Sequence, residues 1–118
     1  MSKILIIDDE VSLNKALSKV AVLSNHSVKC AFCLKEGLEV WNSFLPDIVL
    51  LDVFLPDANA LQFISKLDLK GAKLVLMSAH EELNKKQVQG FLGVDLFLPK
   101  PFLNIFKSFQ QITALLEK

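Results

Sequence analysis

Short unbroken runs of apolar residues alternate along this chain with stretches in which apolar residues recur every three or four positions. The clearest runs cover 4–7, 48–51, 74–77 and 96–98. Unbroken apolar runs of this length are typical of parallel strands that are buried on both faces. Polar and apolar residues alternate at 27–31, as they do in an edge strand. The pattern therefore predicts five strands.

Helical spacing of apolar residues fills the intervals that follow these strands. Four stretches are clear. They are marked by Leu13, Leu17 and Val20; by Leu34, Leu38, Trp41 and Leu45; by Leu61, Ile64 and Leu67; and by Phe102, Ile105 or Phe106, Phe109, Ile112 and Leu116. A further stretch at 82–91 has the loosest register, and we expect its helix to be the least firmly held. Parallel neighbours need crossover connections, which helices supply. The order predicts a doubly wound, five-stranded α/β sheet.

Length and charge exclude several classes of protein. A chain of 118 residues that is 52% hydrophobic suits one domain, 1–118, which needs no disulfide or structural metal. Thirteen basic residues balance thirteen acidic ones, so no overall positive charge draws the chain to nucleic acid. The N-terminus has the pattern of neither a signal peptide nor a membrane span. We therefore expect a cytoplasmic protein that neither binds nucleic acid directly nor inserts into membranes.

Cys30 and Cys33 form a CxxC pair, which raises the question of a redox or zinc site. A structural zinc ion needs four ligands, and His26 and His80 fall at no standard zinc-finger spacing. A thioredoxin-like pair would begin a helix after a strand, whereas Cys30 is expected within the strand itself. We therefore expect two ordinary small side chains.

Polar residues follow each of the clear apolar runs. Asp8 and Asp9 come after the first, Asp52 after the third strand, Ser78 after the fourth and Lys100 close behind the fifth. The carboxyl ends of parallel strands share one edge, where open α/β sheets place their sites. Taken singly, each residue is explained as a turn, a helix cap or a solvated charge. Their occurrence together at four strand ends favours a shared cleft.

Three carboxylates in one cleft repel one another, and a divalent cation would relieve that repulsion at neutral pH. A set of oxygen ligands without Cys or His favours a hard ion. A small number of carboxylates, with room for water and phosphate, favours Mg²⁺ over Ca²⁺. Asp52 could then act as a nucleophile and carry a phosphoryl group as an acyl phosphate. The metal, Lys100 and Ser78 would bind the phosphoryl oxygens.

Four motifs, each after a predicted strand, together resemble the receiver domain of two-component response regulators over the whole chain. They are Asp8-Asp9-Glu10, Leu51-Asp52-Val53-Phe54-Leu55-Pro56, Ser78-Ala79-His80 and Pro99-Lys100-Pro101-Phe102. The resemblance implies a flavodoxin-like (βα)5 three-layer sandwich with strand order 2-1-3-4-5. It also implies a cis peptide bond between Lys100 and Pro101.

By this resemblance Asp52 is the phosphoacceptor, and Ser78 and Lys100 bind the phosphoryl group. The implied Mg²⁺ ligands are Asp9 directly, Asp8 largely through water, Asp52, and the carbonyl of Phe54. Ser78 and Phe97 would form a switch that reshapes the surface of the fourth helix, fifth strand and fifth helix. The implied partners are a sensor histidine kinase or phosphotransfer protein, and a downstream protein or C-terminal output domain. The chain would catalyse only its own phosphorylation and dephosphorylation.

Three positions depart from the family pattern or vary within it. Ala60 stands where receivers usually carry Gly, and a positive φ there would strain an Ala. Phe54 and His80 occupy variable positions that, in the family, tune how fast the phosphoryl group is lost.

Other functions remain open at this point. A receiver-like interaction module that is never phosphorylated would share the fold, although all the acids and Lys100 are present. A haloacid dehalogenase-type phosphatase needs a second Asp two residues after the first, where this chain has Phe54. A flavodoxin or Rossmann nucleotide-binding protein needs a glycine-rich loop, and none follows any strand. The sequence leaves open whether the chain is complete or the N-terminal part of a longer regulator.

Overall fold

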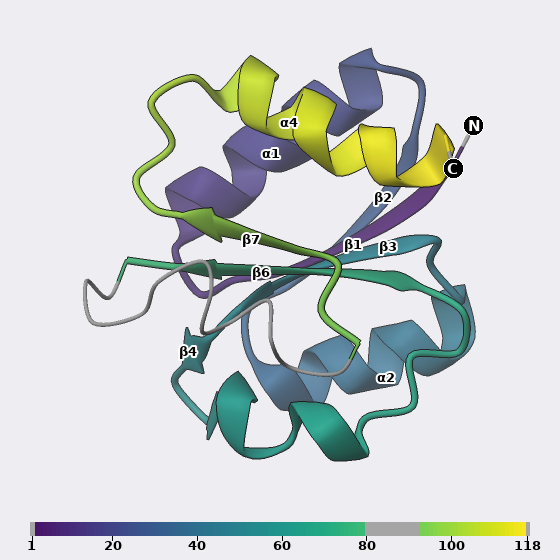
Figure 1. The fold of residues 1–118 in the computed structure, drawn as a ribbon, viewed down its shortest axis with the longest axis vertical. Coiled ribbons are helices and arrows are strands. Elements are labelled where there is room, and N and C mark those ends of the chain that lie inside the picture. Colours follow the sequence, from purple (N-terminus) through teal and green to yellow (C-terminus); the bar gives the residue numbers. More distant parts are fainter. Residues whose placement is uncertain (1, 80–92, 118) are drawn as a thin grey trace.

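A parallel β-sheet covered by helices on both faces forms the computed structural model of this protein (Figure 1), which describes residues 2–79 and 93–117. The sheet has the order β2-β1-β3-β6-β7, and every neighbouring pair is parallel. Its strands are β1 (Lys3–Ile7), β2 (Ser27–Ala31), β3 (Ile48–Asp52), β6 (Lys73–Ser78) and β7 (Leu96–Pro99). In chain order this is 2-1-3-4-5, so the predicted fold class and strand order are confirmed.

Alternation along the strands builds a separate core on each face of the sheet. Ile4 and Ile6 point to the face covered by α1 (Val11–Leu23) and α4 (Ile105–Thr113). Leu5 and Ile7 point to the other face, where α2 (Leu34–Phe44) lies. Because both faces are covered, all four residues are fully buried, as the unbroken apolar run predicts.

The prediction of a third α-helix, marked by Leu61, Ile64 and Leu67, is wrong. The segment folds instead into two 3-10 turns, η1 (Ala60–Gln62) and η2 (Ile64–Lys66), which are interrupted at Phe63. Its apolar markers Leu61, Ile64 and Leu67 recur every three residues, which is the period of a 3-10 helix and not the 3.6 residues of an α-helix. Ile64 is nevertheless buried in the core on the α2 face of the sheet.

The last predicted helix is present as α4, followed by the 3-10 turn η3 (Ala114–Glu117). It begins at Ile105, three residues later than Phe102, because the side chain of Asn104 accepts hydrogen bonds from the N–H groups of Phe106 and Lys107. The helix predicted at 82–91 lies outside the described residues.

After β3 the chain forms a short hairpin in which β4 (Phe54–Leu55) pairs with β5 (Ala58–Asn59). Ala60 follows the hairpin and is fully buried. The described residues with positive φ are Asn25, Leu45, Lys70, Gly71 and Gly93, so the strain considered for Ala60 does not arise. The N–H of Ala60 instead donates to the carbonyl of Val53 at 2.8 Å, which closes the loop behind Asp52.

Candidate functional site

Four strands bring polar side chains to the carboxyl edge of the sheet. Asp8 follows β1, Asp52 ends β3, Ser78 ends β6, and Lys100 follows β7. Asp8, Asp52 and Ser78 are all buried, although the apolar runs that precede them form the core. Because the strands are parallel, residues far apart in the sequence share one edge, as the sequence predicts.

Asp8, Asp9 and Asp52 form an acidic cluster at this edge. Each offers a carboxylate oxygen, and these oxygens lie within 4.8 Å of one another. Asp8 and Asp52 are buried, whereas Asp9 is exposed. Oxygen donors alone suit a hard divalent cation such as Mg²⁺. The three carboxylates therefore fit the metal that the sequence predicts.

Lys100 bridges two of these acids. Its Nζ lies 3.0 Å from Oδ2 of Asp8 and 3.4 Å from Oδ2 of Asp52. The backbone holds the residue in place, since the N–H of Lys100 donates to the carbonyl of Ser78 at 2.8 Å. The Lys100–Pro101 peptide bond is cis, which confirms that prediction.

Backbone N–H groups orient both buried carboxylates. Oδ1 of Asp8 accepts from the N–H of Glu10 at 2.8 Å, and Oδ1 of Asp52 accepts from the N–H of Phe54 at 3.3 Å. Each carboxylate thus has one oxygen turned to its own loop and the other to Lys100. This arrangement fixes the two buried acids face to face across the ammonium group.

The electrostatics of the cluster are unfavourable without a further cation. Burial raises the pKa of Asp52 from 3.8 to about 6; Lys100 opposes this rise, and the charge of Asp8 adds to it. Burial acts to lower the pKa of Lys100, but its contacts with Asp8 and Asp52 outweigh this and raise it. When all four groups are ionised, three carboxylates against one ammonium leave two negative charges. A divalent cation would neutralise them.

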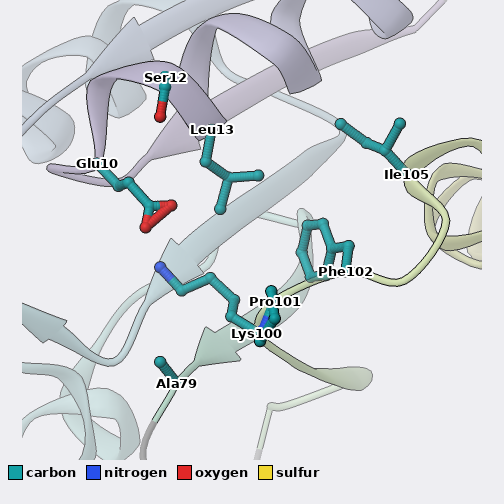
Figure 2. Close-up of a pocket in the computed structure, with 8 residues that line it drawn as sticks. All are labelled: Glu10, Ser12, Leu13, Ala79, Lys100, Pro101, Phe102 and Ile105. Atoms are coloured by element: carbon teal, nitrogen blue, oxygen red, sulfur yellow. The ribbon is translucent and has the colours of Figure 1, made fainter.

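A pocket of about 370 Å³ opens beside Lys100. Figure 2 shows it between the start of α1, with Glu10 and Leu13, and the chain after β7, with Phe102 and, at the start of α4, Ile105. Its walls are therefore largely apolar, and charged side chains lie at the end next to the acidic cluster. The pocket therefore lies next to the strand ends that carry the acids.

The other predicted site residues lie at or near the same edge. Ser78 is buried at the end of β6, and Phe54 is half-buried in β4, two residues after Asp52. Phe97 lies in β7 and packs into the core on the α2 face, away from the acids. The roles of Ser78, Phe54 and Phe97 remain predictions.

Two residues that contact the site region were not predicted. Asn14 is fully buried in α1, and its side chain donates to the carbonyl of Asp8. Its position could have been predicted, because Asn14 shares helical spacing with the buried Leu17, Val20 and Ala21. Asp57 accepts hydrogen bonds from the N–H groups at the start of α2, more than 20 residues away. No local pattern in the sequence indicates that contact.

The two cysteines occupy different elements. Cys30 lies within β2, as expected, and Cys33 is the residue that precedes α2. Neither is in a disulfide, and Sγ of Cys30 lies 2.7 Å from Oγ of Ser18. That the pair has no redox or zinc role stays a prediction.

The chain matches the profile of the response regulator receiver domain over residues 4–111. It belongs to this family. Receiver domains act in two-component signal transduction, generally bind Mg²⁺ at an acidic pocket, and are not enzymes in the usual sense. This assignment excludes the phosphatase and nucleotide-binding classes considered above.

Two curated relatives are regulators longer than this chain. The receiver is 34% identical over 105 residues to the transcriptional regulatory protein CiaR of Streptococcus pneumoniae, covering 86% of this chain and 46% of CiaR. It is 29% identical over 102 residues to the response regulator MprA of Mycolicibacterium vanbaalenii, covering 85% of this chain and 44% of MprA. The chain therefore spans about half the length of these relatives.

Solved structures support the fold. The non-phosphorylated HemR receiver domain of Leptospira biflexa matches with a TM-score of 0.78 and 26% identity, covering 98% of this chain and 93% of that one. A two-component response regulator from Clostridium difficile has a TM-score of 0.85 at 23% identity, covering 100% and 98%. Among the described residues of the receiver, no helix is long and apolar enough to cross a membrane.

Proposed function

We propose that this chain is an Mg²⁺-dependent phosphoacceptor whose Asp52 receives a phosphoryl group from a histidine of a sensor kinase or phosphotransfer protein. The observation that carries the proposal is the contact of Lys100 with both Asp8 and Asp52 inside an oxygen-only acidic cluster. An ammonium group beside a nucleophilic carboxylate is suited to bind the oxygens of an incoming phosphoryl group.

The transfer is a displacement at phosphorus. A carboxylate oxygen of Asp52 forms the new O–P bond while the P–N bond of the phosphohistidine breaks, and the imidazole leaves with the electron pair and takes a proton from solvent. Lys100 and the hydroxyl of Ser78 bind phosphoryl oxygens as negative charge moves onto them. The N–H of Phe54 holds Asp52 by its Oδ1.

Asp8, Asp9 and Asp52, together with the carbonyl of Phe54, would hold the metal ion. When bound, Mg²⁺ supplies positive charge that offsets the carboxylates and the phosphoryl oxygens. Asp9 is exposed, so its carboxylate can bind the ion while water completes the coordination.

The donor histidine is proposed to approach through the pocket beside Lys100 (Figure 2). The apolar side chains of Leu13, Phe102 and Ile105 offer contact area next to the charged edge. The signal would then pass to a downstream protein or to an output domain outside this chain. The curated relatives that extend well beyond the matched region support the second route.

Incubation with acetyl phosphate, followed by intact-protein mass spectrometry, tests the proposal. The parent chain should gain one phosphoryl group with Mg²⁺ present and none with EDTA, and Asp52→Asn should gain none. Asp9→Ala should lose both phosphorylation and the rise in melting temperature that Mg²⁺ causes in the parent, since a ligand of the native state stabilises by mass action.

Asp68→Asn is the matched control, because Asp68 is exposed and its carboxylate accepts a hydrogen bond from the nearby N–H of Lys70, away from the acidic cluster. It should behave like the parent. Phosphorylation of Asp52→Asn at the parent rate, or no effect of EDTA, would show that the site is wrongly assigned.

A further inference from the structure

Asn14 is a buried polar side chain in α1 whose amide group joins the ends of two neighbouring strands. Its Nδ2 donates to the carbonyl of Asp8 at 3.0 Å and to the carbonyl of Ala31 at 3.1 Å. The N–H of Asp8 donates to the same Ala31 carbonyl at 3.1 Å. Asn14 therefore adds a side-chain link at the point where the main-chain pairing of β1 and β2 ends.

The peptide group that Asn14 holds is the one between Asp8 and Asp9. Its carbonyl belongs to Asp8 and its N–H to Asp9, so its orientation sets the direction in which Asp9 leaves the strand end. The Asp8 carboxylate has its own supports, the N–H of Glu10 and Nζ of Lys100. Across residues 2–79 and 93–117, no hydrogen bond or ion pair fixes the Asp9 carboxylate. Its placement thus depends on the backbone.

The two polar atoms of the Asn14 amide differ in their hydrogen bonding. Oδ1 of Asn14 is buried, yet it has no hydrogen-bond partner among the residues that the structure describes. A buried acceptor without a partner is unfavourable, and an apolar side chain of similar size would avoid it on this otherwise apolar helix face. The Nδ2 group, which makes both hydrogen bonds, is therefore the reason for an asparagine here.

We infer that Asn14 is a positioning residue for the metal site: it holds the Asp8–Asp9 peptide so that Asp9 presents its carboxylate to a cation bound with Asp8 and Asp52. The inference rests on the proposed function, which assigns the metal to these acids. Groups that orient metal ligands without touching the ion typically change its affinity by about 10- to 100-fold.

Calorimetric titration of the unphosphorylated protein with MgCl₂ tests the inference without using phosphorylation. Asn14→Leu should bind Mg²⁺ roughly tenfold or more weakly than the parent. Val20→Ala is the matched control, because Val20 is buried on the same helix and lies in the core. It should lower the stability measured by urea unfolding in EDTA but bind Mg²⁺ like the parent.

The possible outcomes separate the role of Asn14 from the proposed metal site. Parent-like Mg²⁺ binding by Asn14→Leu would overturn the inference, as would equal weakening in Val20→Ala. A parent chain that binds no Mg²⁺ would overturn the proposed metal site and the role of Asn14 with it. Should Asn14→Leu fail to fold, Asn14→Ser serves instead, since its shorter hydroxyl cannot bond to both carbonyls; it too should bind Mg²⁺ more weakly.

Discussion

At the scale of single residues, the receiver places a carboxylate where folding alone would not favour it. Asp52 is 6% exposed, beside the charge of Asp8, and Lys100 compensates only in part. A nucleophilic carboxylate must be ionised, and a bound cation would favour that form. The site is therefore expected to trade stability for reactivity in the metal-free state.

This conflict predicts that Asp52→Asn stabilises the metal-free receiver at neutral pH. The folded pKa of about 6 lies above the ordinary 3.8, so the folded state holds the proton more tightly, and stability falls as pH rises through that window. The shift corresponds to about 1 to 3 kcal/mol at pH 7. Lys100 keeps its closer partner Asp8 in the variant.

Urea unfolding in EDTA at pH 7 and below pH 4 would measure this. The free energy of unfolding of Asp52→Asn should be higher than that of the parent at pH 7 and equal to it below pH 4. A less stable variant at pH 7 would mean that the contact of Lys100 with Asp52 outweighs the burial of the carboxylate.

The sequence predicted those site residues whose position follows from the end of a strand. Asp8, Asp52 and Lys100 each follow an apolar run, and the parallel sheet brings them together. Asn14 was missed because a polar residue in an amphipathic helix is ordinarily assigned to the solvent face, although its spacing from Leu17 and Ala21 indicates the buried face. Its burial depends on two carbonyls that only the folded strand ends bring within reach.

At the scale of elements, the hairpin after β3 is tied to the start of α2 by Asp57. Its two carboxylate oxygens accept from the N–H groups of Leu34 and Lys35 at 2.8 and 3.0 Å. These N–H groups have no partner within the helix, and a negative charge there is favourable. The hairpin that begins two residues after Asp52 is thus anchored to the start of α2.

We predict that Asp57→Ala lowers the melting temperature at neutral pH. The two N–H contacts lower the pKa of Asp57 below 3.8, so its stabilisation is fully present above that value and is lost as pH falls through the folded pKa. The difference between the variant and the parent should therefore shrink in strong acid.

Thermal unfolding monitored by circular dichroism at neutral and strongly acidic pH provides the measurement, with Asp68→Ala as the control outside this contact. A pH-independent difference for Asp57→Ala would show that the charge of the cap has no part in it.

Element boundaries were less predictable than element existence. The strands and α1 and α2 follow from hydrophobic period alone, since burial on a sheet face imposes that period. The segment at 60–66 satisfies the same rule with a spacing of three, and its 3-10 turns became evident only in the structure. The start of α4 is set by a side-chain cap at Asn104, which periodicity does not include.

At the scale of the whole molecule, the fold joins segments that are remote in sequence into one site. Asp8 and Lys100 are 92 residues apart, and Asp52 and Lys100 are 48 apart. The apolar runs predicted the sheet. The order of its strands came from resemblance to a known family, because an unbroken apolar run does not indicate which strand lies beside it. The predicted fourth helix lies outside the described residues, so its part in signalling remains a prediction.

Backbone contacts connect the site to β7 and α4, which belong to the surface that is proposed to change on phosphorylation. Ser78 and Lys100 are joined through their backbones at 2.8 Å, and β6 pairs with β7, with Leu76 opposite Phe97. A phosphoryl group bound by Ser78 and Lys100 would therefore act on the ends of both strands. β7 leads directly to α4, so a movement of these ends would reach Phe97 and the helix beyond it.

We predict that phosphorylation shifts a two-state equilibrium on this side of the molecule, with a coupling of about 1 to 3 kcal/mol. Amide chemical shifts should be compared with and without beryllofluoride and Mg²⁺, a mimic of the phosphorylated state. Resonances at 93–111 should change in the parent and stay unchanged in Asp52→Asn. Changes confined to the loops at 8–12 and 52–61 would mean that Asp52 holds the phosphoryl group without passing a signal to β7 and α4. In that case Phe97→Ala should not change the output of the phosphorylated protein. If the switch works, Phe97→Ala should change that output.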